Sequence, residues 1–166
     1  TGAGTNVIKI IGVQKLKDTG YKVMQDRIEA GTLLCAGAIT GGNICLNYKN
    51  ANHITPILNK LEEAGCNIKV EKNRIYMQAP KKLKTMPYPG FPTDMQSIFA
   101  SILTTAKGTS VIVENIFENR YRYTAELNKM GAKITTEGKT AVIKGVRKLS
   151  GATVKSTDLR GGASMI

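Results

Sequence analysis

The chain has 166 residues, three cysteines, no tryptophan and a formal net charge of +12 at pH 7. This length is enough for one large domain or two small repeats, and the few aromatic residues imply an aliphatic core. The charge favours an anionic partner, but the basic–aromatic alternation typical of an RNA-binding sheet is missing, so we expect no nucleic-acid partner.

The cysteines and the single histidine do not form a recognisable site. Cys35, Cys45 and Cys66 make no C-x-x-C pair, and His53 alone cannot build a metal site or a catalytic triad. We therefore expect reduced thiols, no metal and no cofactor. Apolar runs are too short to span a bilayer and no signal sequence is recognisable, so we expect a cytoplasmic protein without a membrane partner.

The first half of the chain predicts an alternation of strands and helices. The first helix carries a single interior charge, Glu29, whereas the second has one apolar and one charged face. In chain order we expect strands at 6–12 and 21–25, a helix at 27–40, a strand at 43–48, a helix capped by Asn52 that ends at Gly65, and a hairpin of strands 67–71 and 74–78.

A proline-rich segment follows, with Pro87, Pro89 and Pro92. Proline fixes φ and disfavours helix at the preceding residue, so residues 86–92 should be extended and stiff. A charge-free helix is expected at 95–106, with Thr93 or Asp94 as its N-cap. Two hypotheses for Asp94 stay open: a helix cap only, or a carboxylate directed at a ligand.

After this helix the order of the first half returns. We expect a strand at 110–114, an amphipathic helix at about 119–130 ended by Gly131, and a hairpin of strands 133–136 and 140–144.

The chain therefore contains an internal repeat. Asp94 follows Asp26 by 68 positions, and a third unit begins around Asp158 and stops eight residues later, so we interpret the chain as a fragment. Each β-α-β-α-β-β unit has a first helix without a polar face, and such a helix must be buried on all sides. We expect these helices to stack in the middle, with the sheets and second helices outside and one side left open.

Six separated segments carry a more specific signal. They are Asp26–Thr32, Phe91–Gln96, Phe117–Arg120, Glu126–Ala132, Leu149–Ala152 and Thr157–Arg160. In sequence and in order they strongly resemble the UDP-N-acetylglucosamine 1-carboxyvinyltransferases, also called enolpyruvyl-UDP-GlcNAc synthases. The resemblance covers essentially the whole chain.

The resemblance implies an α/β fold, the inside-out α/β barrel of the enolpyruvyl transferases, here with two repeats and the start of a third. It places residues 1–20 at the end of a first domain and its crossover, and residues 21–166 in a truncated second domain. The repeats then fall at about 21–86 and 87–152, with the third starting at 153–166.

The implied reaction transfers enolpyruvyl from phosphoenolpyruvate to the 3-hydroxyl of UDP-N-acetylglucosamine. It is the first committed step of peptidoglycan synthesis and takes place in the bacterial cytoplasm. The related 5-enolpyruvylshikimate-3-phosphate synthases share the fold and are the alternative. A basic nucleic-acid-binding repeat protein is a further alternative, motivated by the charge alone.

The resemblance also implies site residues. Asp94 matches an aspartate that contacts the sugar 3-hydroxyl and is proposed as its general base, and Asp158 matches a second aspartate linked to proton transfer. Ile116 matches a position whose backbone contacts UDP-N-acetylglucosamine. Arg120 and Arg160 match arginines of the cleft, and a guanidinium is suited to binding phosphate or carboxylate.

Other parts of the implied machinery are absent from the chain. The family's catalytic cysteine and an arginine that binds phosphoenolpyruvate have no counterpart here, and none of the three cysteines lies in the matching motif. We therefore expect the chain alone to be inactive. We also expect it to self-associate, because helices 27–40 and 95–106 should lose part of their cover.

Overall fold

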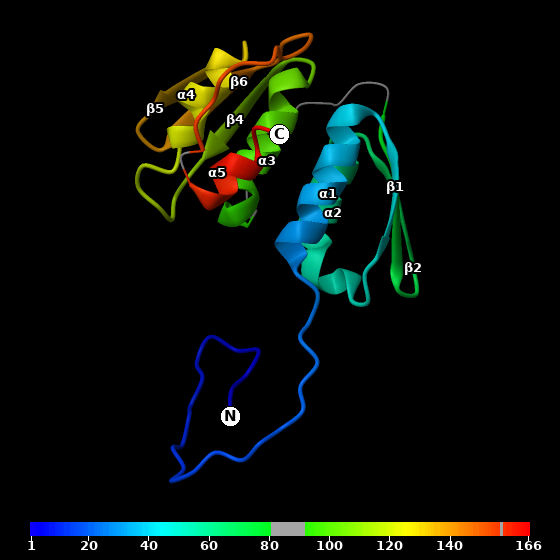
Figure 1. Ribbon diagram of the computed structural model, residues 1–166, viewed down its shortest axis with the longest axis vertical. Coiled ribbons are helices and arrows are strands. Elements are labelled where there is room, and N and C mark those ends of the chain that lie inside the picture. Colours follow the sequence, from blue (N-terminus) through cyan, green and yellow to red (C-terminus); the bar gives the residue numbers. More distant parts are fainter. Residues whose placement is uncertain (81–91, 157) are drawn as a thin grey trace.

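The computed structural model describes residues 1–80, 92–156 and 158–166. Two units with the same order of elements are followed by the start of a third (Figure 1). The first unit contains α1 (Arg27–Thr40), β1 (Asn43–Asn47), the 3-10 turn η1 (Ala51–Ile54), α2 (Thr55–Glu63), β2 (Asn67–Glu71) and β3 (Arg74–Gln78). The second contains the 3-10 turn η2 (Thr93–Met95), α3 (Gln96–Thr105), β4 (Thr109–Val113), α4 (Arg122–Lys129), β5 (Lys133–Glu137) and β6 (Thr140–Lys144), and α5 (Leu159–Ala163) opens the third.

Each unit carries one antiparallel three-stranded sheet, with the strand orders β1-β3-β2 and β4-β6-β5. In the first sheet the central residue Ile75 pairs with Leu46 on one side and Val70 on the other. In the second sheet Ala141 pairs in the same way with Ile112 and Thr136. The hairpins expected from the sequence are confirmed, and their matching register shows that the repeat extends to the pairing of individual residues.

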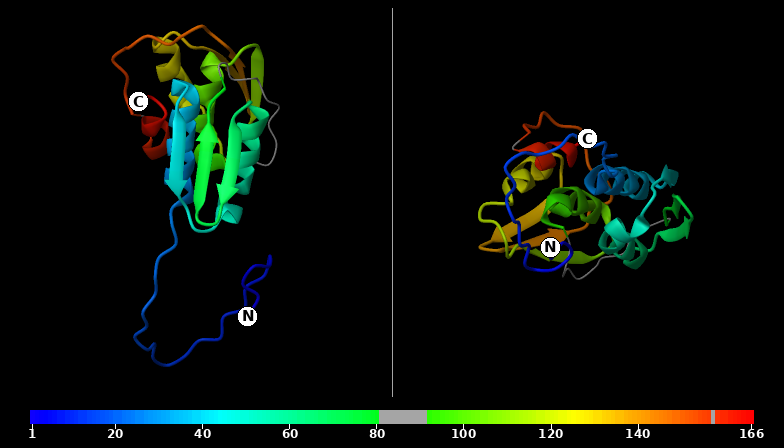
Figure 2. Two further views of the ribbon diagram at one scale, coloured as in Figure 1. Left: turned by 90° about the vertical axis from the view of Figure 1, so that its right-hand side faces the viewer. Right: turned by 90° about the horizontal axis from the view of Figure 1, so that it is seen from below.

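The helices lie inside and the sheets outside (Figures 1 and 2). Helix α1 packs directly against α3, and α3 is buried from Gln96 to Thr104. The close approach depends on Gly31, where an added Cβ would lie 2.9 Å from the Met95 Cε atom. The stacking of the charge-free helices inside the sheets is thus confirmed. Helix α2, expected outside together with the sheet, lies on the same side of its sheet as α1 (Figure 2), and the described residues do not close a barrel.

The two strands expected near the N-terminus are not formed. Residues 1–26 contain no helix or strand and are exposed, and they project away from the two units in both side views (Figures 1 and 2). A strand needs a neighbour for its backbone N–H and C=O groups. Gln25, at the end of this segment, bonds to the first unit without forming a strand. Its side-chain amide donates to the Asn47 carbonyl (2.7 Å) and accepts from the Lys49 N–H (2.7 Å), and its own carbonyl accepts from the Tyr48 hydroxyl (3.4 Å).

The expected loss of helix cover is right for one helix and wrong for the other. On α1, Leu33 and Ile39 are exposed. Helix α3 stays covered because α5 packs against it, and the Ser101 hydroxyl donates to the Ser164 carbonyl at 2.6 Å. Even the short start of the third unit is therefore enough to shield α3.

The stiff proline segment lies outside the described residues, apart from Pro92, which directly precedes η2. In the part of the chain that the structure describes, none of the helices is long and apolar enough to cross a membrane.

Candidate functional site

Asp94 does not cap the helix that follows it. It lies within η2, and α3 begins after Met95 without a side-chain cap. The equivalent residues of the other units do cap their helices: the Asp26 carboxylate accepts from the N–H groups of Ile28 and Glu29, and Asp158 caps α5 in the same manner. The expectation that Thr93 or Asp94 is an N-cap is therefore wrong, and the cap-only hypothesis for Asp94 falls with it.

The Asp94 carboxylate instead faces an arginine from the loop between β4 and α4. The Arg120 Nη2 atom donates to Asp94 Oδ1 at 3.2 Å and to the Thr93 carbonyl at 3.5 Å. The guanidinium also lies over the Phe117 ring, 5.3 Å from its centroid. The Asp94 side chain is 44% exposed, and ion pairs of such exposure contribute only about 0–1 kcal/mol to stability. This pair is therefore not needed to hold the fold together.

A buried carboxylate, Glu114, lies beside the pair and directly follows β4 in the chain. Its Oε2 atom accepts from the Thr93 hydroxyl (2.9 Å) and the Gln96 amide (2.6 Å), while Oε1 accepts from the N–H groups of Ile116 (2.7 Å) and Phe117 (3.2 Å). One side chain thus joins the start of α3 to the loop that carries Arg120. Leaving a buried donor without its acceptor costs about 1–3 kcal/mol, so this junction is sensitive to substitution.

The environment keeps Glu114 ionised. Burial raises its pKa, but the hydrogen bonds from Ile116, Thr93 and Phe117 and the charge of Arg120 outweigh burial, and the pKa lies below its ordinary value. A carboxylate that accepts several N–H and O–H groups is stabilised in its charged form. Glu114 is therefore a fixed negative acceptor at neutral pH rather than an exchanging proton donor.

The loop is fastened at its far end by Tyr121. Its hydroxyl lies 3.0 Å from the Ile112 carbonyl oxygen and 2.9 Å from that of Lys139, and burial raises its pKa to about 12. Beside it is an open pocket of ≈ 510 Å³. The pocket is lined by Glu114, Phe117, Glu118, Asn119, Arg120, Tyr121, Arg122, Thr136, Gly138 and Lys139. Three of these side chains are basic (Arg120, Arg122 and Lys139) and two are acidic (Glu114 and Glu118), so the lining carries a net positive charge that suits an anionic group.

The remaining predicted residues are divided between this loop and α5. The Ile116 side chain is 69% exposed, while its N–H is turned inward to Glu114. Asp158 and Arg160 lie at the start of α5, and the Asp158 Oδ1 atom accepts from the Arg160 and Gly161 N–H groups. The structure therefore brings Asp94, Arg120 and Ile116 into one site, and it assigns Asp158 a helix cap on a separate element.

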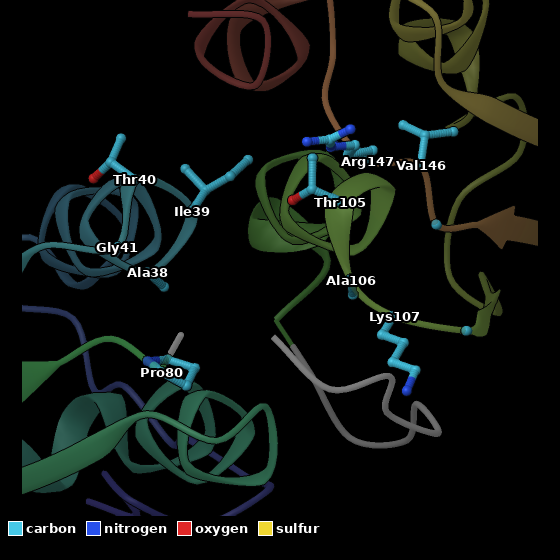
Figure 3. A pocket seen from close by; sticks show the side chains of 12 residues that line it. Ala38, Ile39, Thr40, Gly41, Pro80, Thr105, Ala106, Lys107, Val146 and Arg147 are labelled. Carbon is cyan, nitrogen blue, oxygen red and sulfur yellow. The ribbon is translucent and has the colours of Figure 1, made fainter. Parts of the chain in front are cut away.

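Another pocket, of ≈ 630 Å³, lies at the opposite end of α3 (Figure 3). Ile39 and Thr40 at the end of α1 face Thr105 and Arg147 across it. Lys107, which follows the C-terminal end of α3, also lines the pocket. It marks the seam between the two units and contains none of the predicted site residues.

The buried thiols are poor nucleophiles. Burial raises the pKa of Cys35 and raises that of Cys66 to about 11, whereas the attacking species of a catalytic cysteine is the thiolate. Cys45 is exposed on β1. Within the described ranges, His, Cys, Asp and Glu form no group of three suited to a metal ion.

Glu114 and its partners were missed at the sequence level. Glu114 was expected only as the last residue of a strand, and Gln96 only as part of a charge-free helix. A usable signal was present, because an acidic residue directly after the apolar end of β4 (Thr109–Val113) stands where its side chain can turn into the loop. Its link to Thr93 and Gln96 spans about twenty positions and depends on the tertiary fold.

Comparison with known proteins gives a consistent result. The sequence profile of the EPSP synthase (3-phosphoshikimate 1-carboxyvinyltransferase) family matches residues 1–166. A UDP-N-acetylglucosamine 1-carboxyvinyltransferase of Desulfofundulus thermocisternus is 51% identical over 171 residues, covering 99% of this chain and 70% of that protein. Similarly named proteins of Geobacter metallireducens (50% identical) and Caldanaerobacter subterraneus (48%) match 99% and 100% of this chain, which spans 41% of each of them.

Solved structures agree on the fold. The enolpyruvyl transferase NikO from Streptomyces tendae superposes with a TM-score of 0.75 at 22% identity, over 86% of this chain and 36% of that protein. An EPSP synthase from Acinetobacter baumannii superposes with a TM-score of 0.69 at 21% identity, over 93% of this chain and 41% of that protein.

Proposed function

This chain belongs to the EPSP synthase family and, within it, to the UDP-N-acetylglucosamine 1-carboxyvinyltransferases, and we propose that it forms one side of the active site of such an enzyme. The reaction would transfer enolpyruvyl from phosphoenolpyruvate to the 3-hydroxyl of UDP-N-acetylglucosamine and release phosphate. The observation that carries the proposal is the Asp94–Arg120 pair. Asp94 does not cap α3, its carboxylate is partly exposed, and its partner Arg120 belongs to the loop that lines the pocket.

Asp94 is assigned the role of general base. As the 3-hydroxyl oxygen bonds to the phosphate-bearing carbon of phosphoenolpyruvate, the carbon–carbon double bond opens and its methylene carbon takes up a proton. The hydroxyl proton passes to the Asp94 carboxylate, which has no capping hydrogen bond to compete for it. Departure of phosphate with loss of a proton from the new methyl group then restores the double bond. Arg120 contacts Asp94 Oδ1 and so orients the carboxylate. A guanidinium in this position also supplies positive charge for the anionic substrates.

Ile116, Arg160 and Asp158 are assigned supporting roles. Ile116 would contact the UDP-sugar through its backbone, and Arg160 would bind an anionic group at the opposite side of the cleft. Asp158 would assist proton transfer, in addition to capping α5. A further domain would supply the reactive cysteine, with residues 1–20 as the crossover to it and residues 21–166 as part of the second domain.

The biological setting follows from the same assignment. The partners would be UDP-N-acetylglucosamine and phosphoenolpyruvate, with no nucleic acid, membrane or cofactor, and the step would serve peptidoglycan and cell-wall synthesis in the bacterial cytoplasm.

The test is phosphate release by a full-length protein that carries this segment. With phosphoenolpyruvate and UDP-N-acetylglucosamine we expect turnover that is lost in Arg120→Ala as well as in Asp94→Asn. The family profile and one structural neighbour bear the EPSP synthase name, so shikimate 3-phosphate is the acceptor to compare. Turnover with shikimate 3-phosphate, and none with the UDP-sugar, would reject the assignment.

A further inference from the structure

The Glu114 carboxylate controls the direction of one peptide group in the site loop. The Phe117 N–H and the Ile116 carbonyl belong to the same peptide unit, and in a trans peptide these groups point in opposite directions. The N–H donates to Glu114 Oε1 at 3.2 Å, so the Ile116 carbonyl must point away from Glu114. Because Glu114 is only 5% exposed and the Ile116 side chain is 69% exposed, that direction leads out of the core.

The other oxygen of the same carboxylate acts on the turn that holds Asp94. Oε2 accepts from Thr93 and Gln96, which bracket Asp94 in the chain. Gln96 is in turn fixed from its other side, because its Oε1 accepts from the Tyr123 hydroxyl at 3.2 Å. A single rigid acceptor therefore sets the relative position of the Asp94 turn and the Ile116–Phe117 peptide.

We propose that Glu114 is a positioning residue that aims the Ile116 carbonyl at the acceptor substrate and holds it in register with the Asp94 carboxylate. The inference rests on the proposed function for the identity of the acceptor, a nucleotide sugar with a free hydroxyl. Glu114 lines the pocket, but both of its oxygens are occupied by protein donors, so the proposal assigns it no direct contact with the substrate. Its effect reaches the reaction through the geometry of two neighbouring groups.

The chain offers a matched control. Glu126 is also a buried carboxylate, 8% exposed, and accepts from Lys129 Nζ (2.7 Å) and from the Lys155 N–H (2.9 Å). It lies on α4 and bonds no residue of the site. Glu126→Gln therefore reports the cost of neutralising a buried, hydrogen-bonded carboxylate of the same unit without disturbing the Ile116–Phe117 peptide.

The experiment compares Glu114→Gln with Glu126→Gln in a full-length protein that carries this segment. In Glu114→Gln an amide NH₂ group replaces one carboxylate oxygen. This group can only donate, so it cannot accept from the N–H and O–H donors that face it, and the four hydrogen bonds cannot all form. We expect the KM for UDP-N-acetylglucosamine to rise and kcat to fall, each by about tenfold or more, with the KM for phosphoenolpyruvate unchanged. Glu126→Gln should lower Tm comparably and leave all three constants near those of the wild type.

A purely structural role predicts a different result and would overturn the proposal. In that case Glu114→Gln would reduce only the amount of active enzyme and leave both KM values unchanged, as in Glu126→Gln. Where Glu114→Gln does not fold, Thr93→Val is the second variant, because it removes one donor to Oε2 and keeps the shape. The same selective rise in the KM for the UDP-sugar supports the proposal, and unchanged KM values reject it.

A readout without substrate separates this proposal from the proposed function. In the ¹⁵N-labelled 166-residue chain, the Ile116 and Phe117 amide protons should resonate downfield and shift upfield in Glu114→Gln but not in Glu126→Gln. If the wild-type full-length protein does not use UDP-N-acetylglucosamine, the proposed function fails, while these two amides still decide whether Glu114 sets the peptide. If the chemical shifts of the Ile116 and Phe117 amide protons are the same in Glu114→Gln as in the wild type, the positioning role is refuted.

Discussion

Asp94 differs from the equivalent aspartates of the other two units because it does not cap a helix. Its counterparts Asp26 and Asp158 each cap a helix, but Asp94 sits one 3-10 turn ahead of α3 and pairs with Arg120. Because that pair is partly exposed, its contribution to stability is small. The carboxylate can therefore be altered with little effect on the fold, which makes its chemical role testable.

For Asp94→Asn in a full-length protein that carries this segment, we expect kcat to fall by about a hundred- to ten-thousand-fold, the usual range for loss of a general base. The amide keeps the shape but cannot take up the hydroxyl proton. UDP-sugar binding, measured by calorimetry, should weaken much less than turnover. A fall in Tm of many degrees with kcat per folded molecule preserved would instead identify a structural residue.

Glu114 gives a prediction for pH. Its pKa in the folded chain lies below the ordinary value of 4.5, so its ionised form stabilises the fold above that pH, and this contribution is lost as the pH falls from 4.5 through the folded-state pKa. The Tm difference between wild type and Glu114→Gln should be full at neutral pH and should narrow below about pH 4.5. A difference independent of pH down to complete acid unfolding would contradict this, and Glu62→Gln on the exposed face of α2 serves as the control.

Among the helices and strands, local signals were sufficient where caps and turns bracket an element. Helix α1 has the predicted bounds because Asp26 caps its start and Gly41, at φ 73°, ends it in the left-handed conformation. The first hairpin also has the predicted bounds, with Lys72 at φ 47° in its turn. These features are encoded within a few residues of the element that they limit.

Features that depend on distant partners were not predicted. Periodicity cannot show that α3 is preceded by η2, which moves Asp94 out of the capping position, or that residues 6–12 and 21–25 have no neighbouring strand here. The amphipathic helix of the second unit was expected from 119 but begins at Arg122, because Asn119 has φ 55° and belongs to the loop. Asp94 and Arg120 were identified as site residues through motif resemblance and not through spacing, and their ion pair was not predicted.

Gly145, directly after β6, allows the chain to approach the end of α3 closely. An added Cβ there would overlap the Ala106 carbonyl oxygen at the end of α3, and the Gly145 N–H donates to the Gly108 carbonyl at 2.9 Å. We expect Gly145→Ala to destabilise the chain by about 1–3 kcal/mol through overpacking, measured by urea unfolding. Gly151→Ala, where a Cβ meets nothing within 4 Å, should change stability by about 0.5 kcal/mol or less. Equal effects would show that the close approach does not limit the seam.

For the molecule as a whole, the described residues would supply one side of the proposed reaction site, and they leave apolar surface uncovered. The chain spans 41% of the length of several of its relatives, and its own buried thiols are not activated. The outward face of α1 exposes Leu33 and Ile39, next to the groove where α1, α3 and α5 meet.

We expect the 166-residue chain alone to show no turnover. Phosphate release from phosphoenolpyruvate with UDP-N-acetylglucosamine should remain at the background rate, because Cys35 and Cys66 are held as thiols by burial. Sustained release by the purified chain, unaffected when all three cysteines are replaced by serine, would show that the site is complete without a further domain.

The uncovered face of α1 predicts association. Exposed apolar surface is commonly buried by a partner. Helix α5 packs against α3, whereas Leu33 and Ile39 of α1 stay exposed among the described residues. We expect concentration-dependent dimers by light scattering and binding of a hydrophobic dye, both reduced in Leu33→Lys. A monodisperse monomer without dye binding would contradict the prediction, and Leu33→Ala provides a variant of lower hydrophobicity without added charge.

The three aspartates at the starts of the helices have a consequence for substitutions at the middle position. The repeats place the same carboxylate at three equivalent positions, and Asp26 and Asp158 cap their helices whereas Asp94 does not. Under the proposed role of Asp94 as general base, a substitution there would act on turnover and leave the fold largely intact. An inhibitor directed at Asp94 would then meet a residue that the fold tolerates losing but the proposed reaction does not, so a variant that resisted the inhibitor by substitution there would lose turnover.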